Sequence, residues 1–170
     1  MNSMVHSAKN WRFLPILGAF LMVLSLLLVA CGSTQTRSPT PVPNKPGTTV
    51  YTYKGHTDIV PAVAWSPDGK YIVSSGWDLT YQVWEVMTGK RIHTIPGMYV
   101  ATWSPDGKYL ATGSQYEGDN NVHVWNTTTW STVLNYTGNS KGAAAVAWSP
   151  DGKYIASGGN DNTVQVWIAP

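Results

Sequence analysis

The sequence predicts an all-β fold built from three copies of one small antiparallel unit. The first observation is a repeated heptapeptide, WSPDGKY, which occupies residues 65–71, 103–109 and 148–154. The second is that a short alternating run ending in Val-Trp follows each copy. Copies that recur at a period of about 40 residues are typical of stacked units, each packed on its neighbour.

Four short strands joined by tight turns account for the first unit. Ser66–Lys70 predicts a turn, because proline presets one negative φ and Asp-Gly supplies the turn chemistry. The third strand alternates with period two, as a half-buried strand does. The strands are expected at residues 62–66, 71–75, 81–86 and 91–95, and the units at about 51–95, 96–133 and 134–170. Four antiparallel strands per repeat is the pattern of a propeller blade.

The three copies resemble the WD-repeat family of β-propellers. Gly55-His56 matches the Gly-His dipeptide of that family. The tryptophan of the family's closing Trp-Asp pair is kept at Trp84, Trp125 and Trp167. The aspartate after it is not kept. The resemblance covers residues 50–170 and implies three WD-type four-stranded blades.

The same resemblance implies a buried hydrogen-bond network in each blade. In the first unit the matching residues are His56, Ser74, Asp78 and Trp84. The third unit keeps Ser157, Asp161 and Trp167. Asn139 stands in the histidine position of that unit, and the second unit has Met98 there, with Asp119 as a rough equivalent of the aspartate. A buried imidazole and a buried carboxylate are tolerated when each satisfies the other, so we expect one complete network and two partial ones.

A targeting segment is predicted ahead of the repeats. The basic residues Lys9 and Arg12 precede 18 almost wholly apolar residues, 13–30, and Cys31, the only cysteine, follows at once. This order resembles a bacterial lipoprotein signal in which Cys31 is lipidated. An uncleaved membrane anchor is the alternative.

Both interpretations predict the same location. The repeats would lie on the extracytoplasmic side of a bacterial cell membrane, held there by lipidated Cys31 or by the hydrophobic segment. The expected organisation is a signal peptide or anchor at 1–30, a flexible Ser/Thr/Pro-rich tether at 31–49 and the repeats at 50–170.

Charge and motif patterns argue against several classes of function. Without residues 1–30, nine basic and nine acidic residues remain, and a neutral chain without a basic cluster argues against nucleic-acid binding. Metal-ligand spacings, a nucleophile elbow and a phosphate-binding loop are not found in the sequence. We therefore expect no enzymatic activity, no cofactor and no bound metal.

Two aromatic residues outside the repeat register are candidates for a binding surface. Trp77 and Tyr116 fall in corresponding turns of adjacent units, so they are expected at one end of the blades. Exposed aromatics on a rigid rim are favoured anchors for protein or peptide partners. The leading hypothesis is a non-catalytic scaffold for protein–protein interaction. The alternatives are a glycan- or small-ligand-binding propeller domain and a truncated fragment with no retained role.

Three blades are fewer than the four to eight of closed propellers. Val50–Tyr53 is expected to be an outer strand ahead of the first unit, whereas the third unit lacks an outer strand. Two arrangements stay open: a partial propeller, as in a truncated relative of a longer protein, or half of a dimeric six-bladed ring. If the repeats fold, we expect a homodimer with exchanged outer strands, because two-fold symmetry closes at about 60° per blade.

Overall fold

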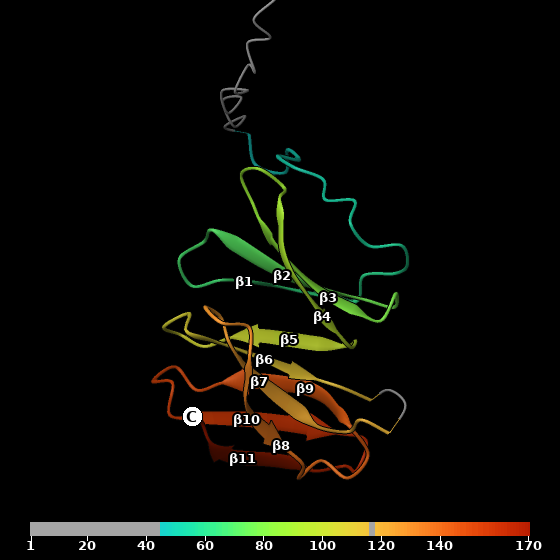
Figure 1. Ribbon diagram of the computed structural model, residues 1–170, viewed down its shortest axis with the longest axis vertical. Coiled ribbons are helices and arrows are strands. Elements are labelled where there is room, and N and C mark those ends of the chain that lie inside the picture. The colour runs from blue at the N-terminus through green and yellow to red at the C-terminus, as the bar shows by residue number, and fades with distance from the viewer. Residues whose placement is uncertain (1–44, 116–117) are drawn as a thin grey trace, which may run out of the picture. The chain divides into compact units, whose positions relative to one another are not determined.

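The computed structural model describes residues 45–115 and 118–170 (Figure 1). In these ranges the secondary structure consists of β-strands. They are β1 (Ala62–Trp65), β2 (Tyr71–Gly76), β3 (Thr80–Glu85), β4 (Arg91–Pro96), β5 (Val100–Trp103), β6 (Tyr109–Gly113), β7 (Val122–Asn126), β8 (Thr132–Tyr136), β9 (Ala143–Trp148), β10 (Tyr154–Gly159) and β11 (Val164–Ile168). Within the same ranges, no helix has the length and hydrophobicity needed to span a membrane.

The strands form three antiparallel sheets, one for each repeat, which confirms the predicted fold class. Their orders are β1-β2-β3-β4, β5-β6-β7-β8 and β11-β10-β9. The first two are four-stranded blades, and the third has three strands among the described residues, with β11 at its edge. β5 contacts both β1 and β9, so the first strands of the three blades lie side by side (Figure 1).

The repeated heptapeptide makes the same turn in every blade. Ser66 Oγ donates a hydrogen bond to Asp68 Oδ1 at 2.6 Å. Asp68 Oδ1 also accepts a hydrogen bond from the Lys70 N–H at 3.1 Å. The corresponding hydroxyl–carboxylate bonds join Ser104 to Asp106 and Ser149 to Asp151. Gly69 has a φ of 69°, in the left-handed region that favours glycine. The turn therefore explains why these letters recur without change.

Each blade has two faces, which we name by what they cover. The trailing face packs on the following blade and the leading face on the preceding one. One buried cluster joins trailing residues Val73, Tyr81 and Val83 of the first blade to leading residues Ala101, Trp103 and Leu110 of the second. A second cluster joins trailing residues Ala111, Val122 and Val124 of the second blade to leading residues Val146, Ile155 and Trp167 of the third. The core therefore lies between the blades.

The segment before the first blade is not a strand in this structure. Residues 48–61 contain no regular strand, so the outer strand expected at Val50–Tyr53 is not formed. Nevertheless, Tyr53 stacks on Trp84 with ring centroids 4.6 Å apart, and its hydroxyl donates to Gln82 Oε1 at 2.8 Å. A β-strand needs a neighbouring strand to which its backbone can hydrogen-bond, and the described residues supply no such strand beside this segment.

Tyr136, in the outer strand of the second blade, makes the same contacts with the third blade. Its ring stacks on Trp167 at 4.3 Å, and its hydroxyl donates to Gln165. Tyr53 and Tyr136 occupy equivalent repeat positions. The segment that contains Tyr53 therefore lies on the first blade where the outer strand of a preceding blade would lie.

Candidate functional site

The first blade contains a connected hydrogen-bond network. The ring nitrogens of His56 lie 2.9 Å from Asp78 Oδ2 and 2.8 Å from Ser74 Oγ, and Trp84 Nε1 donates to that hydroxyl at 3.2 Å. The side chains of His56 and Asp78 are only 4% and 9% exposed. The structure therefore brings together all four residues that the sequence singled out in this unit.

Asp78 stays ionised in this largely enclosed position because several donors surround it. Burial alone would raise the pKa of the carboxyl group. Hydrogen bonds from the Thr80 hydroxyl, the Thr57 N–H and His56 outweigh this effect and hold the pKa of Asp78 below its usual value. The carboxylate thus orients both the histidine and the turn before β3.

The third blade has a shorter network. Trp167 Nε1 donates to Ser157 Oγ at 3.2 Å, and Ser157 donates to Asn139 Oδ1 at 2.7 Å. Asp161 bonds instead to the Thr163 hydroxyl and to the backbone N–H of Ser140. Among the described residues, the buried Nδ2 of Asn139 has no hydrogen-bond partner. Asn139 therefore keeps the hydrogen bond to the serine that His56 makes in the first blade, but it does not reach Asp161.

The second blade uses different residues. Trp125 Nε1 donates to Thr112 Oγ1 at 2.9 Å, and buried Met98 occupies the histidine position. Asp119, the rough equivalent proposed from the sequence, pairs with His123 at 2.9 Å. The Asp119 side chain is 42% exposed, so this pair is much more open to solvent than the pair in the first blade.

The predicted rim surface is described only in part. Trp77 is exposed, and so is Ile59. The backbone N–H of Trp77 donates a hydrogen bond to the backbone carbonyl of Ile59. Tyr116 lies outside the described residues. Whether the two aromatics share a surface therefore stays a prediction.

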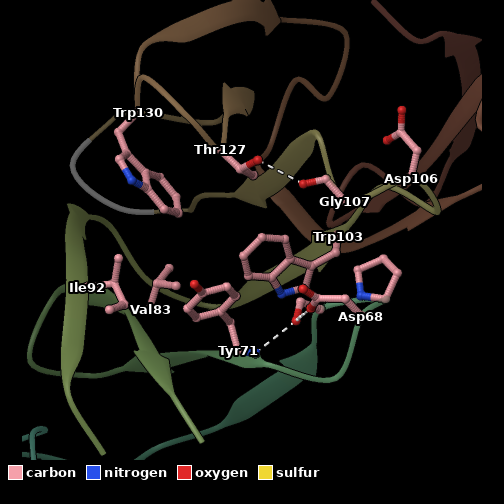
Figure 2. Close-up of a pocket in the computed structure, with 11 residues that line it drawn as sticks. Asp68, Tyr71, Val83, Ile92, Trp103, Asp106, Gly107, Thr127 and Trp130 are labelled. Carbon is pink, nitrogen blue, oxygen red and sulfur yellow. Dashed lines mark hydrogen bonds between the residues drawn. The ribbon is translucent and has the colours of Figure 1, made fainter.

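A slot between the first and second blades was not predicted as a site. Its volume is about 480 Å³. Tyr71, Val83 and Ile92 of the first blade face Trp103 and Trp130 of the second (Figure 2). Its rim carries polar groups of the heptapeptide turns and of the β7–β8 turn: Ser66, Asp68, Asp106 and Thr127.

Trp130 forms one end of the slot through an unusual backbone position. Its φ is 56°, and its ring stacks on His93 of β4 with centroids 4.6 Å apart. Burial lowers the pKa of His93. In the sequence Trp130 simply follows three threonines after Asn126, and nothing in that spacing indicates that it reaches the preceding blade.

Two blade faces remain uncovered in the described part of the chain. Val63 and Trp65, on the leading face of the first blade, are 65% and 58% exposed. On the third blade, the trailing face exposes Tyr154, Val164, Val166 and Ile168. The same positions in the other blades belong to the buried clusters or their margins, except that the equivalents of Ile168 are the polar residues Glu85 and Asn126.

Stacked antiparallel blades with a tryptophan–hydroxyl bond in each define a repeat protein of the β-propeller class. A family model described as "WD domain, G-beta repeat" matches residues 47–85, 89–126 and 130–167, which is more than half of the chain. The chain therefore belongs to the WD40 repeat family. Repeats of this family are typically non-catalytic scaffolds for protein interaction.

Comparisons with individual proteins support the same family. The "Ribosome biogenesis protein BOP1 homolog" of Drosophila grimshawi and that of Drosophila ananassae are each 51% identical over 43 residues, 25% of this chain. The match covers 6% and 5% of those proteins. The chain also resembles U3-55K and the RRP9 WD40 repeats, each with a TM-score of 0.63 and 25% identity over 68% of this chain. It spans 38% and 37% of those two structures.

These relatives contradict the predicted location on a bacterial membrane, which is therefore wrong. The curated relatives are animal proteins named for ribosome biogenesis. The prediction depended on an apolar run followed by a cysteine, a short pattern that says nothing about the repeats. Cys31, the signal or anchor at 1–30 and most of the tether lie outside the described residues, so no geometry bears on them.

Within the described ranges, no group of three or more metal-ligating side chains occurs.

Proposed function

We propose that this chain is a non-catalytic WD40 module that binds proteins, and that one partner is a second copy of the chain. The observation that carries the proposal is the pair of uncovered faces on the first and third blades. Large exposed apolar patches on a folded protein mark interaction sites. Here the patch on each end blade has the composition of a blade interface.

The interfaces inside the chain indicate what would cover these faces. Val83 and Val124, on the trailing faces of the first two blades, are 1% and 0% exposed because the next blade packs on them. Val166 is their equivalent in the third blade and is 67% exposed. The leading face of another first blade carries residues equivalent to those that cover Val83 and Val124, and therefore fits this position.

One aromatic contact specifies the expected geometry. Tyr109, on the trailing face of the second blade, stacks on Trp148 of the third with centroids 6.2 Å apart. The equivalent residues on the uncovered faces are Tyr154 and Trp65, and both are exposed. We expect Tyr154 of one copy to stack on Trp65 of the other.

The free strand edge supports the same partner. β11 is an edge strand, and an unpaired edge is a template for another strand. The segment with Tyr53 already occupies the outer-strand position on the first blade. When two copies dock, residues 50–53 of one copy would lie beside β11 of the other. Such a head-to-tail contact closes into a ring if two copies complete the rotation.

The test uses two variants of the full chain, each with one face disrupted. Val63→Asp places a charge on the leading face and Val166→Asp on the trailing face. Each variant alone should be monomeric in light scattering, because both interfaces of the pair then contain a disrupted face. A mixture of the two variants should recover a dimer, because one interface can form from two intact faces.

A matched control separates this effect from general destabilisation. Val133→Asp adds the same charge at an exposed position of β8, on neither uncovered face. It should leave the dimer intact. The self-association proposal fails if Val133→Asp dissociates the dimer equally, or if the mixture of Val63→Asp and Val166→Asp stays monomeric.

A further inference from the structure

The slot between the first two blades has two chemically different ends. Ile92, Tyr71, Trp103 and Trp130 provide an apolar and aromatic wall, whereas Asp68 stands at the opposite end of the slot. Asp106 lies further along the rim, with its carboxylate turned away from Asp68 (Figure 2). A ligand that fills the slot needs a flat or apolar body and a polar tip. The slot belongs to two neighbouring blades of one chain, so its occupation does not depend on the self-association proposed above.

Each carboxylate presents one oxygen that its own turn does not use. Oδ1 of Asp68 accepts the bonds that hold its turn, and within the described ranges Oδ2 faces the ammonium of Lys70 at 3.6 Å. In Asp106 the same division holds, with Lys108 at 3.2 Å from Oδ2. Both lysine side chains are more than two-thirds exposed, so these ion pairs are weak and open to competition.

The charge state of the slot favours a cation. The Ser66 hydroxyl, followed by the Lys70 N–H, lowers the pKa of Asp68, and Ser104 and Lys108 act in the same way on the pKa of Asp106. Both groups are therefore carboxylates at neutral pH.

The ring of His93, which stacks on Trp130, is a titratable group at the aromatic end of the slot. Because burial lowers its pKa, it is neutral at pH 7 and adds no positive charge there.

We propose that this slot binds the side chain of an arginine in a protein partner, with the guanidinium at Asp68 and the stem along the aromatic wall. A guanidinium is planar, stacks on aromatic rings and presents several N–H donors to a carboxylate, which an ammonium does less well. Its methylene stem suits the apolar part of the slot.

The next blade boundary shows that this site is particular to the first two blades. The corresponding hollow between the second and third blades has a volume of about 300 Å³. It contains the same kind of turn, with Asp106 and Asp151, but lacks an equivalent of Trp130. There Tyr109 stacks on Trp148. The larger slot therefore has an aromatic end, formed by Trp130, that would hold an arginine stem, whereas the smaller hollow does not.

The test is a titration of the full chain with N-acetyl-arginine amide, followed through the indole N–H signals of Trp103 and Trp130 in NMR spectra. The matched probe is the citrulline analogue, which has the same shape without the charge. We expect saturable shifts with arginine and at least about tenfold weaker binding of citrulline, as for one lost charge-assisted hydrogen bond.

Three variants make the result decisive. Asp68→Asn should weaken binding by about tenfold, whereas Asp151→Asn, which changes an identical turn outside the slot, should leave the affinity unchanged. Trp130→Asn should also weaken binding, and asparagine tolerates the positive φ at that position. Equal binding of citrulline, or equal losses in Asp68→Asn and Asp151→Asn, would overturn the proposal, as would the absence of any saturable shift.

Discussion

A single histidine distinguishes the network of the first blade from that of the third. His56 spans from Ser74 to Asp78, whereas Asn139 reaches only Ser157. An imidazole has two ring nitrogens on opposite sides and can bridge two partners, while the shorter asparagine leaves its buried amide nitrogen unpaired. The cost of removing a residue should therefore depend on how many partners it leaves unsatisfied.

We predict that Asp78→Ala destabilises the folded repeats more than Asp119→Ala. The first change leaves buried His56 without its partner, which should cost about 1–3 kcal/mol of unfolding free energy. Asp119 is more exposed and its loss frees His123 to bond to water. Urea titrations of the two variants measure the difference, and equal losses would mean that the buried pair contributes nothing beyond a surface pair.

Asn139→His should stabilise the third blade. Gly159 lies next to Asn139, as Gly76 lies next to His56, and neither has a side chain that would block an imidazole. The new histidine can reach both Ser157 and Asp161, which should add about 0.5–1.5 kcal/mol. The reciprocal change His56→Asn serves as the control and should destabilise. A lower urea midpoint for Asn139→His would contradict this interpretation.

At the scale of strands and blades, the free edge of β11 is the exposed backbone that the assembly should protect. Its N–H groups that point away from β10 have no strand partner among the residues that the structure describes. In the proposed dimer they bond to residues 50–53 of the other copy. We predict slow hydrogen exchange of these amides in the native chain and exchange at least about tenfold faster in Val63→Asp. Exchange in β10 should be unchanged, and fast exchange of β11 in both proteins would exclude strand pairing.

Strand positions were predictable from the sequence because the repeated turn and the period-two runs are local signals. The Ser66–Lys70 turn and β2, for example, lie within one residue of their expected bounds. The slot was not predictable, because it depends on which side chains of two neighbouring blades meet. Trp130 reaches His93 across a blade boundary, and no spacing within one repeat encodes that contact.

The pairing of Asp119 was likewise not predicted. Asp119 is only a rough equivalent of Asp78, and the longer turn of the second blade brings it to His123, four residues on. Insertions move side chains relative to the repeat frame, so equivalence by alignment fails there first. The role of Tyr53 likewise became visible only from its match with Tyr136 in space.

At the scale of the whole molecule, the two internal interfaces bury residues at equivalent repeat positions, and the two outermost faces carry the equivalents of the two sides of such an interface. Complementary ends on one chain favour head-to-tail association, and closure of that association removes both exposed faces and the free edge together. An arginine-binding slot between the first two blades would remain accessible in such a ring, because it lies within one copy.

The most direct test of the proposed dimer is the mass of the full chain in solution, measured by light scattering over a range of concentrations. We expect a species of twice the 18.5 kDa chain mass that does not bind a dye specific for exposed apolar surface. A folded monomer at all concentrations, equally silent to the dye, would contradict the claim that the two faces cover each other.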